Sequence, residues 1–203
     1  KRLGLNRALL ADLDPSTGVI NFLLKLKWPY SFLDALSQSG SLDGDIWRGL
    51  VCSTHGVDVL LAPENGVEPM VDLPDPLPIV DFTRSAYDVV MLDLGEPFSP
   101  WALSLAAAAD QILLVSTNEL PALRSAQRVL QHLDRNHIER GKVRLILNRY
   151  NPEAGLTQDA IETALHTDVT HVLPSDYEAV QKALVEGKTV AGGTPFTKSL
   201  QAL

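Results

Sequence analysis

The chain has 203 residues, of which 45% are hydrophobic and 6% aromatic, and its formal net charge is −8 at pH 7. This length favours one domain over residues 1–203 with a sizeable aliphatic core, and this charge speaks against non-specific binding of nucleic acid. Cys52 is the only cysteine, which excludes an internal disulfide and favours a buried thiol in a reducing compartment. No apolar run is long enough for a transmembrane helix, and residues 1–7 lack the apolar region of a signal peptide.

Short aliphatic runs predict six strands along the chain. The runs are Arg7–Asp12, Val57–Leu61, Asp88–Leu94, Gln111–Ser116, Val143–Asn148 and Val169–Leu173. Most consist of Val, Ile and Leu without alternation, which is typical of parallel strands that are buried on both faces.

Helical patterns lie between the predicted strands. Leucines at spacings of three and four predict an amphipathic helix over Pro121–Asn136, and an Ala-rich run predicts another over Trp101–Ala109. Thr157 is a typical cap of a further helix, and Ser175–Glu178 has the pattern of a capping box. Strands that alternate with helices predict an α/β fold, with a mostly parallel sheet and helices on both faces.

Two other segments carry separate expectations. The proline-rich stretch Glu64–Thr83 predicts an irregular surface connection. Residues 194–203 predict a terminal helix that packs into the core through Phe196, Leu200 and Leu203, in preference to a helix that targets a membrane.

Acidic residues follow two of the predicted strands. Asp12 and Asp14 end the first run, and Asp93 ends the third run in the pattern of four apolar residues followed by Asp. Ligands of open parallel sheets bind beyond the carboxyl ends of the strands, where such an Asp can hold the Mg²⁺ of a nucleotide. The alternative for Asp93 is an Asp that only caps the next turn.

Several stretches resemble segments of the MinD/ParA class of P-loop ATPases, in that family's order. ALLADLDPSTG (8–18) is similar to the switch-I segment, and DVVMLDLGEP (88–97) to the switch-II and Walker-B segment. LLVSTNELPALRSAQRVL (113–130) resembles the strand, turn and helix that follow. LILNRYNP (145–152) resembles the strand with the base-reading Asn, and VLPSDYEAVQKALVEGKTV (172–190) resembles the final strand, turn and helix.

Within that class, the sequence is most similar to the CpaE/TadZ group, the pilus-assembly ATPases of Flp-type pili. The similarity lies in FLDAL (32–36), LLAPE (60–64), the Pro-Trp pair at 100–101 and LNRY (147–150). The resemblance implies ATP and Mg²⁺ as ligands.

The resemblance also implies roles for individual residues. Asp14 would be the catalytic residue, close to the attacking water and to the metal, and Asp93 would be the Walker-B metal ligand. The further nucleotide contacts that it implies are Asp12 and Gly95 near the phosphates, Asn148 and Arg149 at the adenine, and Pro174 and Asp176 over the base.

The family's first strand and P-loop would lie upstream of Lys1, so the chain is expected to be an N-terminally truncated ATPase domain that is inactive alone. The only loop-like sequence, EGKTV at 186–190, has Lys182 where a P-loop needs Gly, and it follows a predicted helix. We expect Gly187 to end that helix.

A complete protein of this kind would hydrolyse ATP, form an ATP-dependent homodimer and act with pilus or secretion assembly proteins. It would be cytoplasmic, at the pole or the inner face of the membrane, with membrane association through partners and without nucleic acid. Leu94 and Glu96 depart from the family's pattern, which favours an inactive scaffold as an alternative. A ParA-type DNA-partitioning ATPase is the other alternative.

Overall fold

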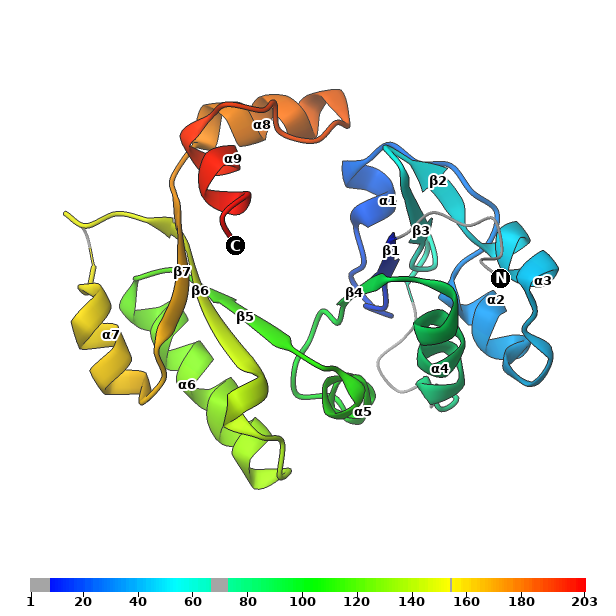
Figure 1. Cartoon of the computed structure of the whole chain (residues 1–203), viewed down its shortest axis with the longest axis horizontal. Coiled ribbons are helices and arrows are strands. Elements are labelled where there is room, and N and C mark those ends of the chain that lie inside the picture. The colour runs from blue at the N-terminus through cyan, green and yellow to red at the C-terminus, as the bar shows by residue number, and fades with distance from the viewer. Residues whose placement is uncertain (1–7, 67–72, 154) are drawn as a thin grey trace. The chain divides into compact units, whose positions relative to one another are not determined.

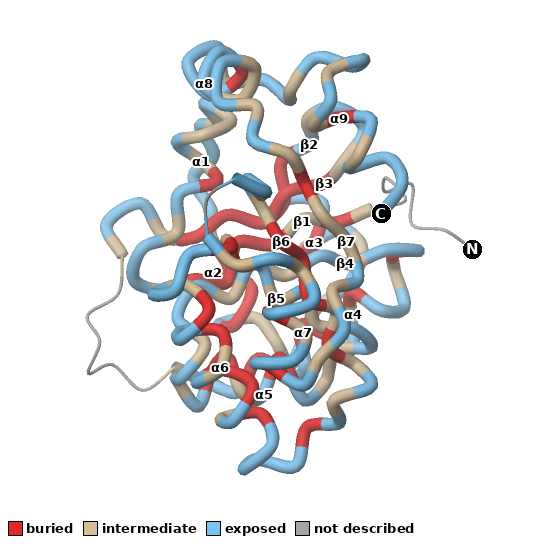
Figure 2. The backbone as a smooth tube through the Cα atoms, turned by 90° about the vertical axis from the view of Figure 1, so that its left-hand side faces the viewer, coloured by how far each residue is buried: buried red, intermediate tan, exposed pale blue. Residues whose placement is uncertain are grey.

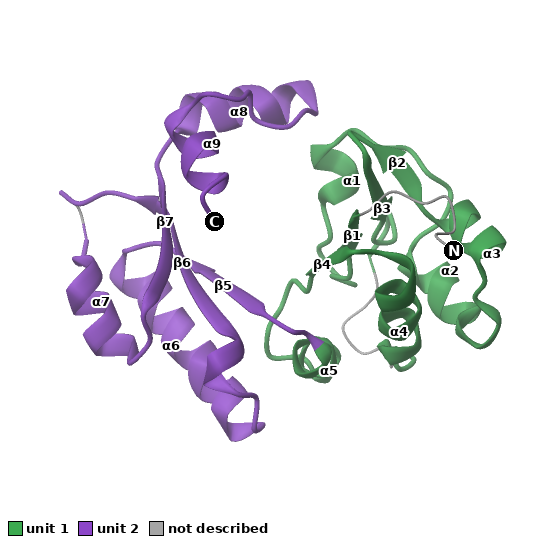
Figure 3. Cartoon of the chain, viewed as in Figure 1, with its two compact units in different colours: residues 1–108 green, residues 109–203 purple. Residues whose placement is uncertain are grey.

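The computed structural model describes residues 8–66, 73–153 and 155–203. The chain divides into two compact units, residues 1–108 and residues 109–203 (Figure 3). We describe each unit by itself, and the expectation of one ATPase domain over residues 1–203 stays a prediction.

Each unit is built around its own sheet (Figure 1). In the described residues the strands are Ala8–Asp12 (β1), Cys52–Thr54 (β2), Val57–Leu60 (β3), Val89–Asp93 (β4), Ile112–Ser116 (β5), Val143–Tyr150 (β6) and Val169–Pro174 (β7). The strand order is β2-β3-β1-β4 in the first unit and β5-β6-β7 in the second. Every pairing is parallel except that of β2 with β3. The predicted mostly parallel α/β fold is therefore confirmed, and so are all six predicted strands.

Helices connect most of the strands. They are Ile20–Leu23 (α1), Phe32–Ser37 (α2), Gly44–Leu50 (α3), Leu77–Ala86 (α4), Pro100–Ala108 (α5), Leu120–Arg135 (α6), Gln158–Leu165 (α7), Tyr177–Glu186 (α8) and Pro195–Leu200 (α9), with short 3₁₀ turns at Ser39–Ser41 (η1) and Arg140–Lys142 (η2). The helices predicted near α5, α6 and α7 are confirmed, and Thr157 caps α7 as expected. The sequence patterns did not predict α1, α2, α3 or the short strand β2.

Helices cover both faces of the sheet in the first unit. Leu9 and Ala11 of β1 belong to the larger cluster of buried side chains, which α2, α3, α4 and α5 complete. The other cluster joins Ile20 of α1 to Val59 of β3, with Leu10 packed against it. The buried residues of β1 and β3 can be followed in Figure 2. The alternation of Leu9, Leu10 and Ala11 between two cores explains why β1 is apolar as far as Ala11.

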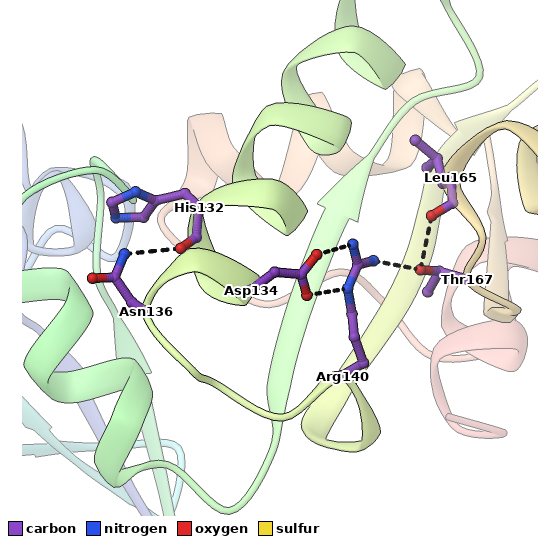
Figure 4. A network of polar contacts seen from close by, with 6 residues as sticks. All are labelled: His132, Asp134, Asn136, Arg140, Leu165 and Thr167. Atoms are coloured by element: carbon purple, nitrogen blue, oxygen red, sulfur yellow. Dashed lines mark hydrogen bonds and ion pairs between the residues drawn. The ribbon is translucent and has the colours of Figure 1, made fainter.

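In the second unit, α6 packs on β5, while α7 and α9 pack on β7. Buried leucines of β6, such as Leu145 and Leu147, lie in the middle strand of the sheet. Near the amino ends of β6 and β7, Arg140 joins the end of α6 to the residues that precede β7 (Figure 4). Its guanidinium donates two hydrogen bonds of 2.6 Å to Asp134 and one of 2.9 Å to Thr167.

Two local expectations were wrong, the first of them only in part. The stretch Glu64–Thr83 is not irregular throughout, because α4 begins at Leu77; residues 67–72 lie outside the described residues. Pro78 lies in the first turn of α4, where a missing N–H costs nothing, and Ile79 is buried. The helix α8 begins at Tyr177 without a side-chain cap, so the Ser175–Glu178 capping box is not formed.

The terminal helix α9 is present, but it does not bury all of its predicted apolar residues. Phe196 is half-buried, whereas Leu200 and Leu203 are exposed. Polar contacts hold the helix instead: Ser199 Oγ donates to the Val172 carbonyl at 2.7 Å, and His171 Nε2 lies 2.7 Å from the Ser199 carbonyl. Gly187 ends α8 with a positive φ, as predicted.

Candidate functional site

The carboxyl ends of β1 and β4 lie side by side in the first unit. The two strands pair in parallel with Asp12 opposite Asp93, and the N–H of Leu13 donates to the Asp93 carbonyl at 2.8 Å. Both strands therefore end at one level, and the loop from Asp12 to Thr17 leaves the sheet beside Asp93. This edge brings together the carboxylates that the sequence singled out.

Asp12 is a buried carboxylate that organises the loop after β1. Its Oδ2 accepts a 3.0 Å hydrogen bond from the N–H of Ile20, and its Oδ1 lies 3.4 Å from the N–H of Asp14. Burial raises the pKa of Asp12; these backbone hydrogen bonds act against the rise, and the nearby negative charges of Asp93 and Asp14 add to it. Gly18 packs so closely on Asp12 Oδ1 that a Cβ there would lie 2.6 Å from it.

Asp14 is also buried, and its own loop satisfies its carboxylate. Oδ1 accepts hydrogen bonds of 2.9 Å from the N–H groups of Ser16 and Thr17, and Oδ2 accepts one of 2.6 Å from the Thr17 hydroxyl. Burial on its own raises the pKa of Asp14, but these three hydrogen bonds outweigh it and hold the pKa below its usual value. Asp14 is thus an anion in the folded chain at neutral pH.

Gly95 joins the β4 end to Asp14. It has a positive φ of 61°, and a Cβ at this position would overlap the Asp14 carboxyl group. Any other residue would be strained at this φ and would displace that side chain. The structure therefore gives Gly95 a close backbone approach to Asp14 beside the exposed residues Asp93 and Glu96.

Trp101, a residue of the buried cluster, holds the loop that follows β1. The sequence did not predict this contact. Its indole N–H donates to the Leu13 carbonyl at 2.9 Å, and its ring lies 5.6 Å from that of Phe32, centroid to centroid. The carbonyl that it holds lies between Asp12 and Asp14. The Pro-Trp pair was visible in the sequence, but only the fold shows that the indole reaches this carbonyl.

The other predicted site residues lie in the second unit, at the carboxyl ends of β6 and β7. Tyr150 pairs with Pro174, the last residue of β7. Asn148 is half-buried near the end of β6, and its Oδ1 accepts a 2.9 Å hydrogen bond from the N–H of Arg149. Arg149 is exposed and has a positive φ of 52°, a conformation uncommon outside glycine.

Asp176 precedes α8 but does not cap it with its side chain. Its Oδ2 is buried and has no hydrogen-bond partner among the described residues. A buried carboxylate oxygen without a partner is costly, so a donor from a ligand would stabilise it there.

Asn118 is a further buried polar residue of the second unit that the sequence reading did not single out. Its side-chain amide donates to the Asn151 carbonyl at 2.8 Å and to the Leu156 carbonyl at 3.2 Å. Gly155 has a positive φ, and a Cβ there would overlap the Asn118 carbonyl oxygen. The loop after β5 is thus joined to the loop after β6, and the signal in the sequence was only an Asn in a turn before a helix.

The carboxylates of the first unit suit a magnesium–nucleotide complex. Across the described residues, no group of three His, Cys, Asp or Glu side chains forms a complete metal-binding cluster. Mg²⁺ needs no such cluster, because it keeps several waters and binds one or two carboxylates together with phosphate oxygens. Asp93 offers exposed oxygens for this, and Asp14 a buried anion beside them.

In residues 8–66, 73–153 and 155–203, no helix combines the length and apolar character that crossing a bilayer requires.

The chain is similar to septum site-determining proteins MinD. It is 24% identical over 188 residues to MinD of Synechocystis sp. strain PCC 6803, which covers 88% of this chain and 68% of that protein. It is 26% identical over 127 residues to MinD of Thermotoga maritima, which covers 60% of this chain and 47% of that protein. No protein-family model matches the chain.

Solved structures resemble the chain over nearly its whole length. A ParA family ATPase from Chlorobium tepidum matches with a TM-score of 0.86 at 21% identity, over 96% of this chain and 84% of that one. MinD from Aquifex aeolicus matches with a TM-score of 0.74 at 19% identity, over 98% and 81%. MinD of Pyrococcus horikoshii, solved with Mg-ADP, matches with a TM-score of 0.75 at 18% identity, over 97% and 81%.

The chain therefore has the fold of the MinD and ParA P-loop ATPases. The fold class that the sequence motifs predicted is confirmed. The finer resemblance to the CpaE/TadZ group, and the expected place of a P-loop upstream of Lys1, stay predictions.

Proposed function

We propose that this chain belongs to an ATP-binding, nucleotide-switched ATPase that localises or assembles a pilus or secretion apparatus, in the manner of the CpaE/TadZ group. The observation that carries the proposal is the pairing of Asp12 with Asp93 at the carboxyl end of the sheet, with the Asp14 anion against Gly95. Carboxylates gathered at this edge of a parallel sheet suit a phosphate-bound metal.

Each carboxylate then has a distinct role. Asp93 would hold Mg²⁺, which when bound neutralises the charge that develops on the phosphates. Asp14 would accept a hydrogen bond from the attacking water, after its carboxylate gives up the hydroxyl of Thr17. Asp12 would hold the loop in place through the N–H of Ile20.

The second unit would supply the recognition of the base. Asn148 and Arg149 would contact the adenine, and Pro174 and Asp176 would cover it. The buried Oδ2 of Asp176, which has no partner among the described residues, supports a donor from the base at this position.

The phosphate-binding part would come from a strand and P-loop upstream of Lys1. Support comes from β4, which ends the order β2-β3-β1-β4 among the described strands and exposes Val89 and Met91. A further apolar strand on this edge would pair with β4 and reduce the exposure of apolar surface. The complete protein would be cytoplasmic, at the pole or the inner face of the membrane, and would form an ATP-dependent homodimer that engages assembly proteins.

The test uses the complete protein, including the region encoded upstream of Lys1. We expect slow ATP hydrolysis in Mg²⁺ and an ATP-dependent dimer in light scattering. Asp14→Asn should lower hydrolysis by roughly 100-fold while nucleotide still binds, because one charged acceptor at the reacting water is lost. Asp81→Asn, an exposed carboxylate on α4, is the control and should leave both readouts unchanged. A complete protein that binds no nucleotide would contradict the proposal.

A catalytically inactive scaffold is the second candidate. Two observations favour it: the Asp14 carboxylate already accepts three hydrogen bonds from its own loop, and Glu96 places a negative charge next to Gly95. Nucleotide binding and dimerisation without turnover, and with no gain in turnover from Glu96→Gln, would select the scaffold.

A DNA-partitioning ATPase is the third candidate. A putative plasmid partition protein from Borrelia burgdorferi, solved with AMPPNP, shares the fold with a TM-score of 0.67 at 14% identity. The net charge of −8 opposes this candidate. ATP-dependent, salt-sensitive DNA binding by the complete protein would select it over the pilus role.

A further inference from the structure

The segment Val19–Tyr30, which includes α1, exposes an unusual set of large apolar side chains. Phe22 is 79% exposed and Trp28 41%, and Val19 and Tyr30 are exposed as well. The segment (VINFLLKLKWPY) contains two lysines and no acidic residue, in a chain with a net charge of −8. We call this the 19–30 segment.

The 19–30 segment is held in place from its inner side. The N–H of Ile20 donates to the buried Asp12, and the N–H of Leu26 donates to the Asn21 carbonyl at 2.8 Å, which closes the turn after α1. Leu24 and Leu26 pack against the cluster of buried side chains that contains Ile20. The exposed side chains are therefore what the outer surface of a folded segment presents.

Trp28 has a fixed orientation within this segment. Its indole N–H donates to the Gly49 carbonyl at 3.1 Å, so the polar edge of the ring is turned to the protein while two fifths of the residue stay accessible. An exposed aromatic ring with its donor already satisfied gains more from an apolar surrounding than one that must desolvate its N–H.

The charges decide which partner suits the segment. Lys25 and Lys27 are exposed between Phe22 and Trp28. Aromatic rings interleaved with lysines suit the headgroup level of an anionic membrane, where rings enter the boundary and ammonium groups meet phosphates. Lysine is depleted in protein interfaces, and a two-fold contact between copies of this segment would bring like charges together.

We propose that the 19–30 segment docks the protein directly on an anionic lipid surface, with Phe22 and Trp28 entering the headgroup boundary and Lys25 and Lys27 contacting lipid phosphates. The inference goes beyond the proposed ATPase function and does not depend on it, because lipid contact needs no nucleotide. It also differs from membrane association through partners, since the chain itself makes the contact.

The experiment measures tryptophan emission of the full chain mixed with phosphatidylcholine vesicles, with and without phosphatidylglycerol, in the absence of nucleotide. Trp47 is 0% and Trp101 9% exposed, so Trp28 is the tryptophan of residues 8–66, 73–153 and 155–203 that can respond. We expect a blue shift with the anionic vesicles alone, reduced by salt, and lost in Trp28→Phe. Co-sedimentation with the same vesicles measures the partition coefficient.

Variants distinguish docking through the 19–30 segment from non-specific adsorption to vesicles. Phe22→Ser should lower partitioning roughly tenfold by removing apolar surface, and Lys25→Glu with Lys27→Glu should lower it by at least about tenfold. Tyr177→Ser removes an exposed aromatic residue of α8 and should change nothing. Circular dichroism checks that each variant is folded.

Three outcomes would overturn the proposal. One is equal binding to neutral and anionic vesicles. Another is binding that Tyr177→Ser reduces as much as Phe22→Ser does. The last is no vesicle binding together with a Trp28 emission shift on addition of another protein, which would make the segment a protein interface.

Discussion

The two units end their parallel strands in different chemistry. In the first unit, β1 and β4 end in Asp12 and Asp93, and the backbone closes around buried carboxylates through Gly18 and Gly95. In the second unit, the strand ends carry an amide at Asn148 and a proline at Pro174, and both residues are half-buried. The first edge gathers three carboxylates, whereas the second carries the Asn148 amide together with the charged residues Arg149 and Asp176.

The polar side chains at the two sheet edges are also stabilised in different ways. A buried carboxylate is tolerable only while its hydrogen bonds hold, so the first edge depends on backbone geometry over several residues. In the second edge, the side chain of Asn148 has a local partner, because its Oδ1 accepts from the adjacent N–H of Arg149. The following predictions test this contrast, from the largest effect to the smallest.

The largest effect should come from the two cores. Leu9→Ala in β1 and Leu145→Ala in β6 each remove a fully buried leucine, and each should cost about 3 kcal/mol of unfolding free energy. If residues 1–203 form one domain, both variants lower a single transition in calorimetry of the complete protein. Leu203→Ala, an exposed leucine, is the control. Two transitions, each sensitive to one variant, would make the units separate domains.

Glycine substitutions compare the two edges directly. Gly95→Ala forces a Cβ onto the Asp14 carboxyl, and Gly155→Ala forces one onto the Asn118 carbonyl. Each should lower stability by about 2 to 3 kcal/mol, from positive φ and steric overlap together. Urea denaturation measures the loss.

Gly56→Ala is the matched control for these two variants. Gly56 also has a positive φ, of 78°, but a Cβ there would meet nothing within 4 Å. It should cost only about 1 kcal/mol, from the backbone conformation alone. An equal loss in all three variants would show that the close approach to Asp14 contributes nothing.

Asp12→Asn and Asp14→Asn should respond to pH in opposite directions. The raised pKa of Asp12 means that its ionisation removes stability as the pH rises from about 4 through the folded-state pKa. The lowered pKa of Asp14 means that its contribution is present above about pH 4 and is lost as the pH falls through its folded-state pKa.

Urea denaturation between pH 3 and pH 7 measures these two slopes. Asp12→Asn should gain stability relative to the unmodified chain as the pH rises above about 4, and Asp14→Asn should gain relative to it as the pH falls below about 4. Leu203→Ala, which changes an exposed residue without a titrating group, should follow the unmodified chain throughout. Parallel curves for the two site variants would show that the surroundings of Asp12 and Asp14 do not differ as described.

The smallest effect should come from Arg140 in the second unit (Figure 4). Arg140→Lys loses the paired hydrogen bonds to Asp134, but both side chains are more than a third exposed, so the cost should stay below about 1 kcal/mol and shrink in salt. Lys188→Gln, which breaks an exposed pair with Glu186, should change nothing measurable. A loss from Arg140→Lys as large as that from Gly95→Ala would show that this exposed ion pair contributes as much stability as the close packing of Gly95 on Asp14.

Part of this structure could be read from the sequence because the signal is local. Short aliphatic runs such as Val143–Asn148 favour a buried strand, and an Asp at the end of such a run, like Asp93, lies at the ligand edge of a parallel sheet. The helix α4 was missed because prolines read as breakers, although Pro78 is harmless in a first turn. The helices α2 and α3 are short, and tertiary packing of Phe32 and Trp47 stabilises them more than local pattern does.

The sequence by itself determined the alternation of strands and helices, the carboxyl-end positions of Asp12, Asp14 and Asp93, and the likeness to MinD and ParA ATPases. These follow from periodicity and from residue types at strand ends, which short stretches of chain specify. Only the tertiary structure decided that Asp12 has a raised and Asp14 a lowered pKa, that Trp101 holds the Leu13 carbonyl, and that Phe22 and Trp28 face outward. Burial and the contact of Trp101 with Leu13 arise between residues far apart in the chain, and no local pattern encodes them. The partners of Asp14, Ser16 and Thr17, are local, but burial by the fold opposes their effect on its pKa.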